Sequence, residues 1–186
     1  MKRSFDLFAS ITLLILLIAP MLLITIAIVL SSKGKALYWS DRVGQEGIMF
    51  KMPKFRSMRV NTPEIATHLM SNPDSFFSPI GAFLRRTSLD ELPQLFSILK
   101  GDMSLVGPRP ALFNQSDLIA LRTAKGVDKI KPGVTGWAQV NGRDELSIID
   151  KVAFDEEYLE LQSFWFDLKI LWMTLLKVIA RHNVSH

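Results

Sequence analysis

Cysteine is absent from this chain of 186 residues, and histidine is rare. The absence of cysteine excludes disulfides and thiolate metal sites. The three histidines, His68, His182 and His186, are scattered, and two of them lie at the end of the chain. A zinc site is therefore not expected, because zinc requires several nitrogen or sulfur ligands held close together.

Acidic residues are in the minority. The 22 Lys and Arg residues exceed the 18 Asp and Glu residues, which leaves a net charge of +4. A basic balance of this size fits binding to nucleic acid, to anionic lipid headgroups or to phosphorylated substrates. A long apolar segment near the start of the chain favours the last two. We therefore expect membrane lipids and a phosphorylated substrate as partners, and no nucleic acid.

Charge is nearly missing from residues 5–30, where Asp6 is the one ionisable residue. A helix of this length spans ~39 Å, enough to cross a hydrocarbon core of ~30 Å. Pro20 lies near the middle and predicts a bend, because proline removes one helical hydrogen bond. Basic residues flank both ends, which by the positive-inside rule places both on the cytoplasmic face. The residues leave two interpretations open, a kinked spanning helix or a re-entrant helical hairpin broken at Pro20.

Turn residues divide the next part of the chain into short elements. Residues 36–58 are predicted to form a β-hairpin around a Gly-Gln-Glu-Gly turn, residues 61–79 a polar loop, and residues 80–86 a short helix. Another helix is predicted to begin at Ser88 or Asp90, either of which can cap it, and to end at Gly101.

Two further segments complete the chain. Residues 134–140 lie between two turn signals and are expected to form a strand or an extended loop. Residues 164–181 predict a helix with a broad apolar surface on one side and Asp167, Thr174, Lys177 and Arg181 on the other. The tryptophans and flanking cations favour a helix at a membrane surface. A core helix in a globular domain fits the same pattern.

Two adjacent carboxylates, Asp90 and Glu91, lie between Arg85 and the loop that carries Arg109. Carboxylates can act as nucleophile, base or Mg²⁺ ligand, and guanidinium groups hold the oxygens of phosphates. Simple helix capping by Asp90 is the alternative. Prolines on both sides of Arg109 stiffen its loop and favour a fixed direction for its guanidinium.

Five motifs follow one another in a fixed order. They are Lys54-Phe55-Arg56-Ser57-Met58, Ser88-Leu89-Asp90-Glu91-Leu92-Pro93-Gln94, Lys100-Gly101-Asp102-Met103-Ser104, Gly107-Pro108-Arg109-Pro110 and the run from Lys131 to Arg143. Each is weak alone. Together they extend over nearly the whole chain, and they closely resemble the bacterial sugar transferase family, the small monotopic phosphoglycosyl transferases.

The resemblance implies an enzyme that moves a phosphosugar from a UDP-sugar to polyprenyl (undecaprenyl) phosphate and releases UMP, as the first membrane step of glycoconjugate assembly. It implies that Asp90 is the nucleophile and forms a covalent phosphosugar intermediate. Glu91 would complete the pair, and both carboxylates would bind Mg²⁺. The positions that it implies for binding phosphate or nucleotide are Arg85, Arg109, Lys54, Arg56, Gln139 and Arg143.

The resemblance also implies a fold, α+β and mainly helical with a small β-hairpin. Residues 1–32 would form a re-entrant membrane helix broken at Pro20, with both ends cytoplasmic. Residues 33–186 would form a compact catalytic domain with interfacial helices on the cytoplasmic face of the bacterial inner membrane. The chain lacks the extra transmembrane region of larger relatives, so we expect the catalytic unit alone.

The chain departs from the family pattern in two places. Ala19 precedes Pro20 where some relatives have serine, so the bend would depend on Pro20 and packing. Pro53 replaces a common aromatic residue and puts the local strand pairing in doubt. Two other functions remain open, a membrane-bound UDP-sugar hydrolase that needs no lipid acceptor, and a non-catalytic scaffold that binds headgroups.

Overall fold

The structure is a computed structural model that describes residues 1–60, 62, 73–142 and 145–183. Most of the predicted loop at residues 61–79, together with His68 and Arg143, lies outside the described residues. The helices are α1 Lys2–Ser31, α2 Gly81–Arg86, α3 Gln94–Lys100, α4 Ser116–Ala124, α5 Trp137–Asn141, α6 Ile148–Leu161 and α7 Phe164–Asn183. The 3₁₀ turns are η1 Gln45–Gly47, η3 Pro73–Phe76, η4 Leu89–Glu91 and η5 Val127–Lys129. The strands are β1 Leu37–Val43, β2 Met49–Phe55, β3 Ser104–Val106, β4 Ala111–Leu112 and β5 Gly133–Thr135.

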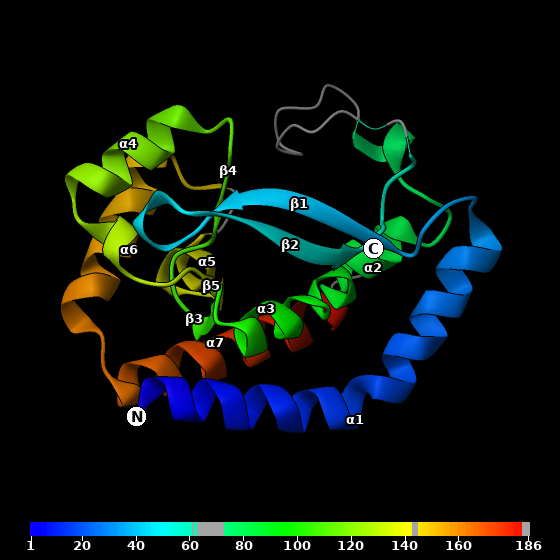
Figure 1. The fold of residues 1–186 in the computed structure, drawn as a ribbon, viewed down its shortest axis with the longest axis horizontal. Helices are drawn as coiled ribbons and strands as arrows, with labels where there is room; N and C mark the ends of the chain where they lie inside the picture. The colour runs from blue at the N-terminus through cyan, green and yellow to red at the C-terminus, as the bar shows by residue number, and fades with distance from the viewer. Residues whose placement is uncertain (61, 63–72, 143–144, 184–186) are drawn as a thin grey trace.

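The described residues are mainly helical around two small sheets, as the predicted α+β class requires (Figure 1). One sheet is antiparallel with the order β2-β1-β4, and the other pairs β3 with β5 in parallel. The predicted hairpin is confirmed, with Trp39 paired to Pro53 in an unbroken register. Pro53 does not disturb the pairing, because β2 is the edge strand of its sheet, where a missing N–H is tolerated.

Helix α1 is long and apolar enough to cross a membrane. It contains Pro20, and its ribbon changes direction sharply near the middle before it reaches β1 (Figure 1). Of its side chains only Asp6, Ser10 and Ile28 are buried. Ile28 packs with Phe55 and Leu84 at the end of the helix. The helix is therefore attached to the rest of the chain near its two ends and leaves its apolar middle uncovered.

The start of α1 is fixed by polar contacts. Arg3 donates to the carbonyls of Ile98 and Leu99 at 2.6 and 3.0 Å, which satisfies the end of α3. The buried carboxylate of Asp6 accepts from the hydroxyl of Ser104 at 2.8 Å and from the N–H of Leu105 at 3.2 Å. These contacts tie the first two turns of α1 to α3 and β3.

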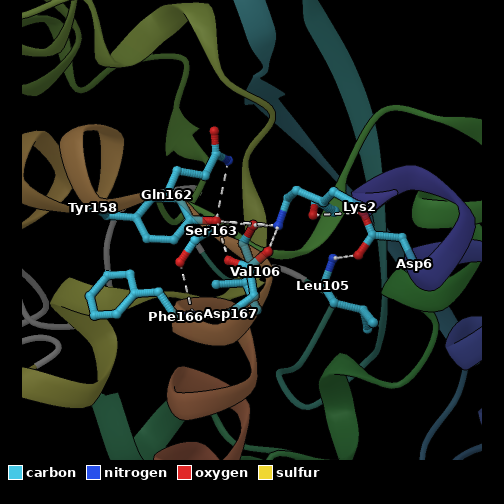
Figure 2. A network of polar contacts seen from close by, with 10 residues as sticks. Lys2, Asp6, Leu105, Val106, Tyr158, Gln162, Ser163, Phe166 and Asp167 are labelled. Atoms are coloured by element: carbon cyan, nitrogen blue, oxygen red, sulfur yellow. Dashed lines mark hydrogen bonds and ion pairs between the residues drawn. The ribbon is translucent and has the colours of Figure 1, made fainter.

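Figure 2 shows the network that surrounds Lys2. The Lys2 ammonium donates to the carbonyl of Val106 at 3.0 Å, to Tyr158 Oη at 3.2 Å and to Asp167 Oδ2 at 2.5 Å. Tyr158 Oη also lies 2.7 Å from Asp167 Oδ1. Burial and the neighbouring carboxylate of Asp167 both raise the pKa of Tyr158 above its ordinary value, so this hydroxyl keeps its proton. The network joins α1, β3, α6 and α7.

Helix α7 has its polar side turned inward. Asp167 and Ile170 are buried, while Trp165, Trp172 and Ile179 are 77%, 61% and 52% exposed. The polar side of the predicted helix meets the protein: Asp167 faces Lys2, and the hydroxyl of Thr174 lies 2.7 Å from that of Thr135. One side of α7 thus belongs to the core through Ile170, and the other side, with both tryptophans, is exposed.

Two boundary predictions are also corrected. Helix α3 ends at Gly101 as expected, with a φ of 101°, but it begins at Gln94, behind Pro93, rather than at Ser88 or Asp90. The segment 134–140, predicted as a strand or an extended loop, is a strand only to Thr135 and then forms α5. Trp137 explains the change, because its ring packs against Phe166 and its indole N–H donates to Glu157 at 2.8 Å.

Candidate functional site

The two adjacent carboxylates lie in a 3₁₀ turn, η4, between α2 and α3. Ser88 enters the turn with a φ of 57°, in the left-handed region that few non-glycine residues adopt. Neither Ser88 nor Asp90 makes a capping hydrogen bond with its side chain, so the helix-cap interpretation of Asp90 is wrong. Asp90 is instead 6% exposed, and none of the described residues donates a hydrogen bond to its carboxylate.

Glu91 is held by two cations from distant parts of the chain. Lys54 Nζ, from β2, lies 2.9 Å from Glu91 Oε1. Arg109 Nη2, from the loop between β3 and β4, lies 2.6 Å from the same oxygen. All three side chains are mostly enclosed, with exposures of 15% for Lys54, 11% for Glu91 and 30% for Arg109. Contacts of this kind are charge-assisted and strong.

The two carboxylates differ in their acidity. Burial alone would raise the pKa of Glu91, but Arg109 and Lys54 outweigh it and hold this pKa well below its ordinary value. Burial raises the pKa of Asp90, and the nearby cations offset this only in part. Burial also lowers the pKa of Lys54, against the opposing attraction of Glu91. Glu91 is therefore a fixed anion, whereas Asp90 binds a proton more readily than an ordinary aspartate.

Asp90 faces a cavity of about 590 Å³. Among the described residues that line this cavity, Asp90 is the one acid. The lining cations are Lys35, Arg42, Lys54, Arg56, Arg59, Arg85, Arg109, Arg122 and Lys151. Tyr38, Ser40 and Arg42 also line it, and alternate residues of a strand share one face, so the cavity extends along β1 for about 13 Å. A space of this length and charge suits an extended polyanion.

The structure brings most of the predicted site residues together. The cavity lining includes Asp90, Arg85, Arg109, Lys54, Arg56 and Gln139. Glu91 lies just behind this lining, on Lys54 and Arg109. The prediction for Arg143 falls outside the described residues.

The hydrogen bonding of two of these residues, Arg56 and Gln139, could not be predicted from the sequence. The two terminal nitrogens of Arg56 donate to the carbonyls of Lys33 and Ser32, the two residues that follow α1, at 2.9 and 3.0 Å. The amide oxygen and nitrogen of Gln139 are enclosed, and no described residue hydrogen-bonds to either. Arg56 thus fastens the apolar helix to the wall of the cavity.

Sequence reasoning missed two arginines that shape the site. Arg42, on β1, donates to the carbonyl of Pro110 at 3.1 Å. Arg122, on α4, donates to the carbonyl of Arg109 at 2.7 Å. Neither belongs to one of the five motifs, and only the three-dimensional arrangement brings them to the loop.

Asp90 and Glu91 are the carboxylates that a magnesium ion at this site would use. Among the described residues no group of three or more His, Cys, Asp or Glu side chains gathers. Mg²⁺ needs fewer, because it keeps several waters and is commonly bound by one or two carboxylates together with substrate phosphates. Asp90 and Glu91 offer two such groups, and Glu91 is ionised throughout the neutral range.

Comparison with known proteins agrees with the motifs. The chain is 42% identical to the UDP-glucose:undecaprenyl-phosphate glucose-1-phosphate transferase of Escherichia coli (strain K12), over 95% of this chain and 40% of that protein. It is 38% identical to the undecaprenyl-phosphate galactose phosphotransferase of Salmonella typhimurium, over 100% of this chain and 42% of that protein. The uncharacterized sugar transferase EpsL of Bacillus subtilis (strain 168) is 40% identical and is covered over 90% of its length.

The chain thus spans about two fifths of the first two relatives and most of the third. The family model described as bacterial sugar transferase matches residues 1–181, which is almost the entire chain. The match includes both the apolar helix and every described residue of the cavity. On this evidence the chain belongs to the bacterial sugar transferase family.

Proposed function

We propose that the chain is a membrane-bound phosphoglycosyl transferase. It moves a phosphosugar from a UDP-sugar to a polyprenyl phosphate such as undecaprenyl phosphate and releases UMP, as the first membrane step of glycoconjugate biosynthesis. One observation carries the proposal: a single carboxylate, Asp90, faces a cavity whose described lining is otherwise rich in cations. The relatives named for glucose and galactose transfer make UDP-glucose and UDP-galactose the first donors to test.

The arrangement of charges supports nucleophilic attack by Asp90. A carboxylate and a diphosphate repel each other, so cations must first neutralise the phosphate oxygens. Arg85, Arg109 and Lys54 provide this charge around Asp90, and each partly offsets the effect of burial on its pKa. Phosphoryl transfer has a loose transition state, so positioning and charge account for most of the catalysis.

The reaction runs in two displacements. An oxygen of the Asp90 carboxylate bonds to the phosphorus that carries the sugar, and the bond from that phosphorus to the bridging oxygen breaks. UMP leaves with the bridging oxygen and its electron pair. A phosphate oxygen of the polyprenyl phosphate then attacks the same phosphorus, and the bond to Asp90 breaks, which restores the carboxylate.

Glu91 keeps a fixed charge beside this nucleophile. Its contacts with Lys54 and Arg109 hold both cations at the edge of the cavity. Mg²⁺, held by Asp90 and Glu91, would supply a Lewis acid for the phosphate oxygens. Further contacts to phosphate or nucleotide are assigned to Arg56, Gln139 and Arg143.

Attachment of α1 near both ends supports a re-entrant helix. Asp6 in its second turn and Ile28 in its last turn are buried against the same body, whereas Leu16 and Leu23 between them are each 68% exposed. A spanning helix would carry its ends to opposite sides of a hydrocarbon core ~30 Å thick. We therefore assign residues 1–32 to a membrane hairpin broken at Pro20.

The remaining residues, 33–186, are assigned to a catalytic domain on the cytoplasmic face of the bacterial inner membrane. The exposed tryptophans of α7, Trp165 and Trp172, suit the interface between headgroups and hydrocarbon. A phosphate acceptor with a polyprenyl tail requires a site at this interface, because the tail stays in the bilayer.

Nucleotide release by the purified protein tests the proposal. The protein in detergent receives UDP-glucose or UDP-galactose, Mg²⁺ and undecaprenyl phosphate, and the nucleotide product is identified by chromatography. We expect multiple turnovers of UMP only with the lipid present, and a loss of at least about 1,000-fold in Asp90→Asn. Asp117→Asn is the matched control, because Asp117 is exposed on α4 outside the cavity lining.

Three results would contradict the proposal. UDP as the product would mean a different bond is broken. Continued UMP release without the lipid would indicate a hydrolase. Full activity in Asp90→Asn would exclude Asp90 as the nucleophile and leave the scaffold interpretation.

A further inference from the structure

The loop that carries Arg109 is held by its backbone carbonyls. Arg122 Nη1 donates to the carbonyl of Arg109 at 2.7 Å, and Arg42 Nη1 donates to the next carbonyl, of Pro110, at 3.1 Å. The other face of the loop is packed against β5 and the residues before it: the N–H of Gly107 donates to Thr135 at 2.9 Å, and a side chain at Gly107 would meet the carbonyl of Lys131 at 2.4 Å. The loop is therefore enclosed between two guanidinium groups and a strand.

Arg122 does not act alone, because a buried carboxylate orients it. Its Nε and Nη2 both donate to Asp155 Oδ2, at 2.9 and 2.6 Å. Arg122 is 8% exposed and Asp155 1% exposed. One guanidinium thus joins α4, α6 and the loop, and its planar fork offers N–H groups in both directions at once. A lysine at this position has no such fork.

Arg109 links the buried pair of Arg122 and Asp155 to the candidate site. The carbonyl that accepts from Arg122 belongs to Arg109, whose guanidinium lies 2.6 Å from Glu91 Oε1. Prolines on both sides limit the backbone rotation of this segment. A shift of the Arg109 carbonyl therefore displaces its guanidinium from Glu91, next to Asp90.

We propose that Arg122 and Asp155 are positioning residues that hold the backbone of Arg109 so that its guanidinium stays on Glu91 beside the nucleophile. Arg122 also lines the cavity, but its Nε, Nη1 and Nη2 already donate to Asp155 and to the Arg109 carbonyl, so its effect on catalysis passes through Arg109. The kinetic consequence rests on the proposed function. The control of the loop by the buried pair does not, because it follows from the contacts alone.

A purely structural ion pair between α4 and α6 is the competing explanation. A buried pair replaced as a whole by apolar side chains commonly leaves stability unchanged, whereas removal of one partner costs about 3–5 kcal/mol. The double variant Arg122→Met/Asp155→Leu therefore removes the hold on the loop while keeping the helices packed. The matched control is Lys125→Met, which breaks the more exposed ion pair, 3.1 Å long, between Lys125 at the end of α4 and Glu156 on α6.

Steady-state UMP release is measured for the double variant, for Arg109→Ala and for all three changes combined, with thermal unfolding recorded for each. We expect kcat to fall about 10- to 100-fold in the double variant, as for a catalytic group displaced by an ångström, with the melting temperature near that of the unaltered protein. In the Arg109→Ala background the same two changes should lower kcat no further, because residues that act through one another are not additive. Lys125→Met should retain its activity.

Hydrogen exchange over residues 107–112 gives a second readout that needs no activity. Faster exchange in the double variant than in Lys125→Met supports the proposal. An unchanged kcat, an equal loss of kcat with and without Arg109, or unchanged exchange would overturn it. If the unaltered protein releases no UMP, the proposed function fails, and exchange alone decides the role of Arg122 and Asp155.

Discussion

Replacement of Lys54 by methionine tests the charge arrangement around the carboxylates. Methionine keeps most of the length of the side chain and removes its charge. The lost contact is a charge-assisted hydrogen bond, 2.9 Å long, between side chains that are 15% and 11% exposed. Such a bond contributes ~1.5–3 kcal/mol. The larger cost of a fully unpaired buried charge does not apply, because Arg109 still pairs with Glu91.

In the proposed reaction the same ammonium group faces the phosphate that Asp90 attacks, so we expect a loss of this size in the transition state. At about 1.36 kcal/mol for each factor of ten, kcat for UMP release should fall roughly 10- to 150-fold. Lys51→Met is the control on the same strand. Lys51 pairs with Asp41 at 3.4 Å, the side chains are 71% and 46% exposed, and an exposed pair contributes at most about 1 kcal/mol. Equal effects of the two substitutions would refute the reasoning.

Two further predictions concern protonation and backbone packing. Asp90 must be ionised to attack, and burial raises its pKa. We therefore expect kcat to fall as the pH decreases, with the midpoint of this fall above the ordinary pKa of 3.8. A midpoint at or below that value would contradict the assignment. A Cβ at Gly133 would lie 2.1 Å from the N–H of Gly107, so Gly133→Ala should shift the Arg109 loop, lower kcat and destabilise the fold by about 1–3 kcal/mol. Gly126→Ala is the control: a Cβ there would lie 3.9 Å from its nearest neighbour, and only the φ of 71° would cause strain. It should lower the melting temperature and leave kcat unchanged. Equal kcat in the two variants would exclude the packing argument.

Local signals were sufficient to predict the simple elements. The hairpin follows from two apolar runs on either side of a glycine turn, and the observed register confirms it. The end of α3 follows from Gly101, whose φ of 101° only glycine adopts without strain. In each case the deciding interaction lies within a few residues of the sequence.

The environment of Asp90 could not be predicted in this way. The tetrapeptide that starts at Ser88 has the composition of a capping box, yet it forms a 3₁₀ turn entered through a left-handed residue. Lys54 lies 37 residues before Glu91, and Arg109 lies 18 residues after it. The sequence identified these residues as members of motifs but contained no signal that they converge on one carboxylate.

The side of α7 that meets the protein could not be predicted for a similar reason. A helical pattern separates apolar from polar residues but does not say which side meets the protein. Asp167 and Thr174 face inward because they have polar partners there, Lys2 and Thr135, from segments more than thirty residues away. With its polar contacts directed inward, the helix leaves Trp165 and Trp172 on the outside.

The first residues of α1 hydrogen-bond to β3, the strand that precedes the Arg109 loop of the site. The carbonyl of Val106 accepts from both Lys2 and Tyr158, and Val106 directly precedes the loop that carries Arg109. Asp6 holds the other end of the same strand through Ser104 and Leu105. Residues 1–32 and 33–186 differ in the environment that we assign to them, but they share one core. Helix α1 is therefore fixed to β3 by hydrogen bonds, and β3 leads directly into the loop to which we assign phosphate binding.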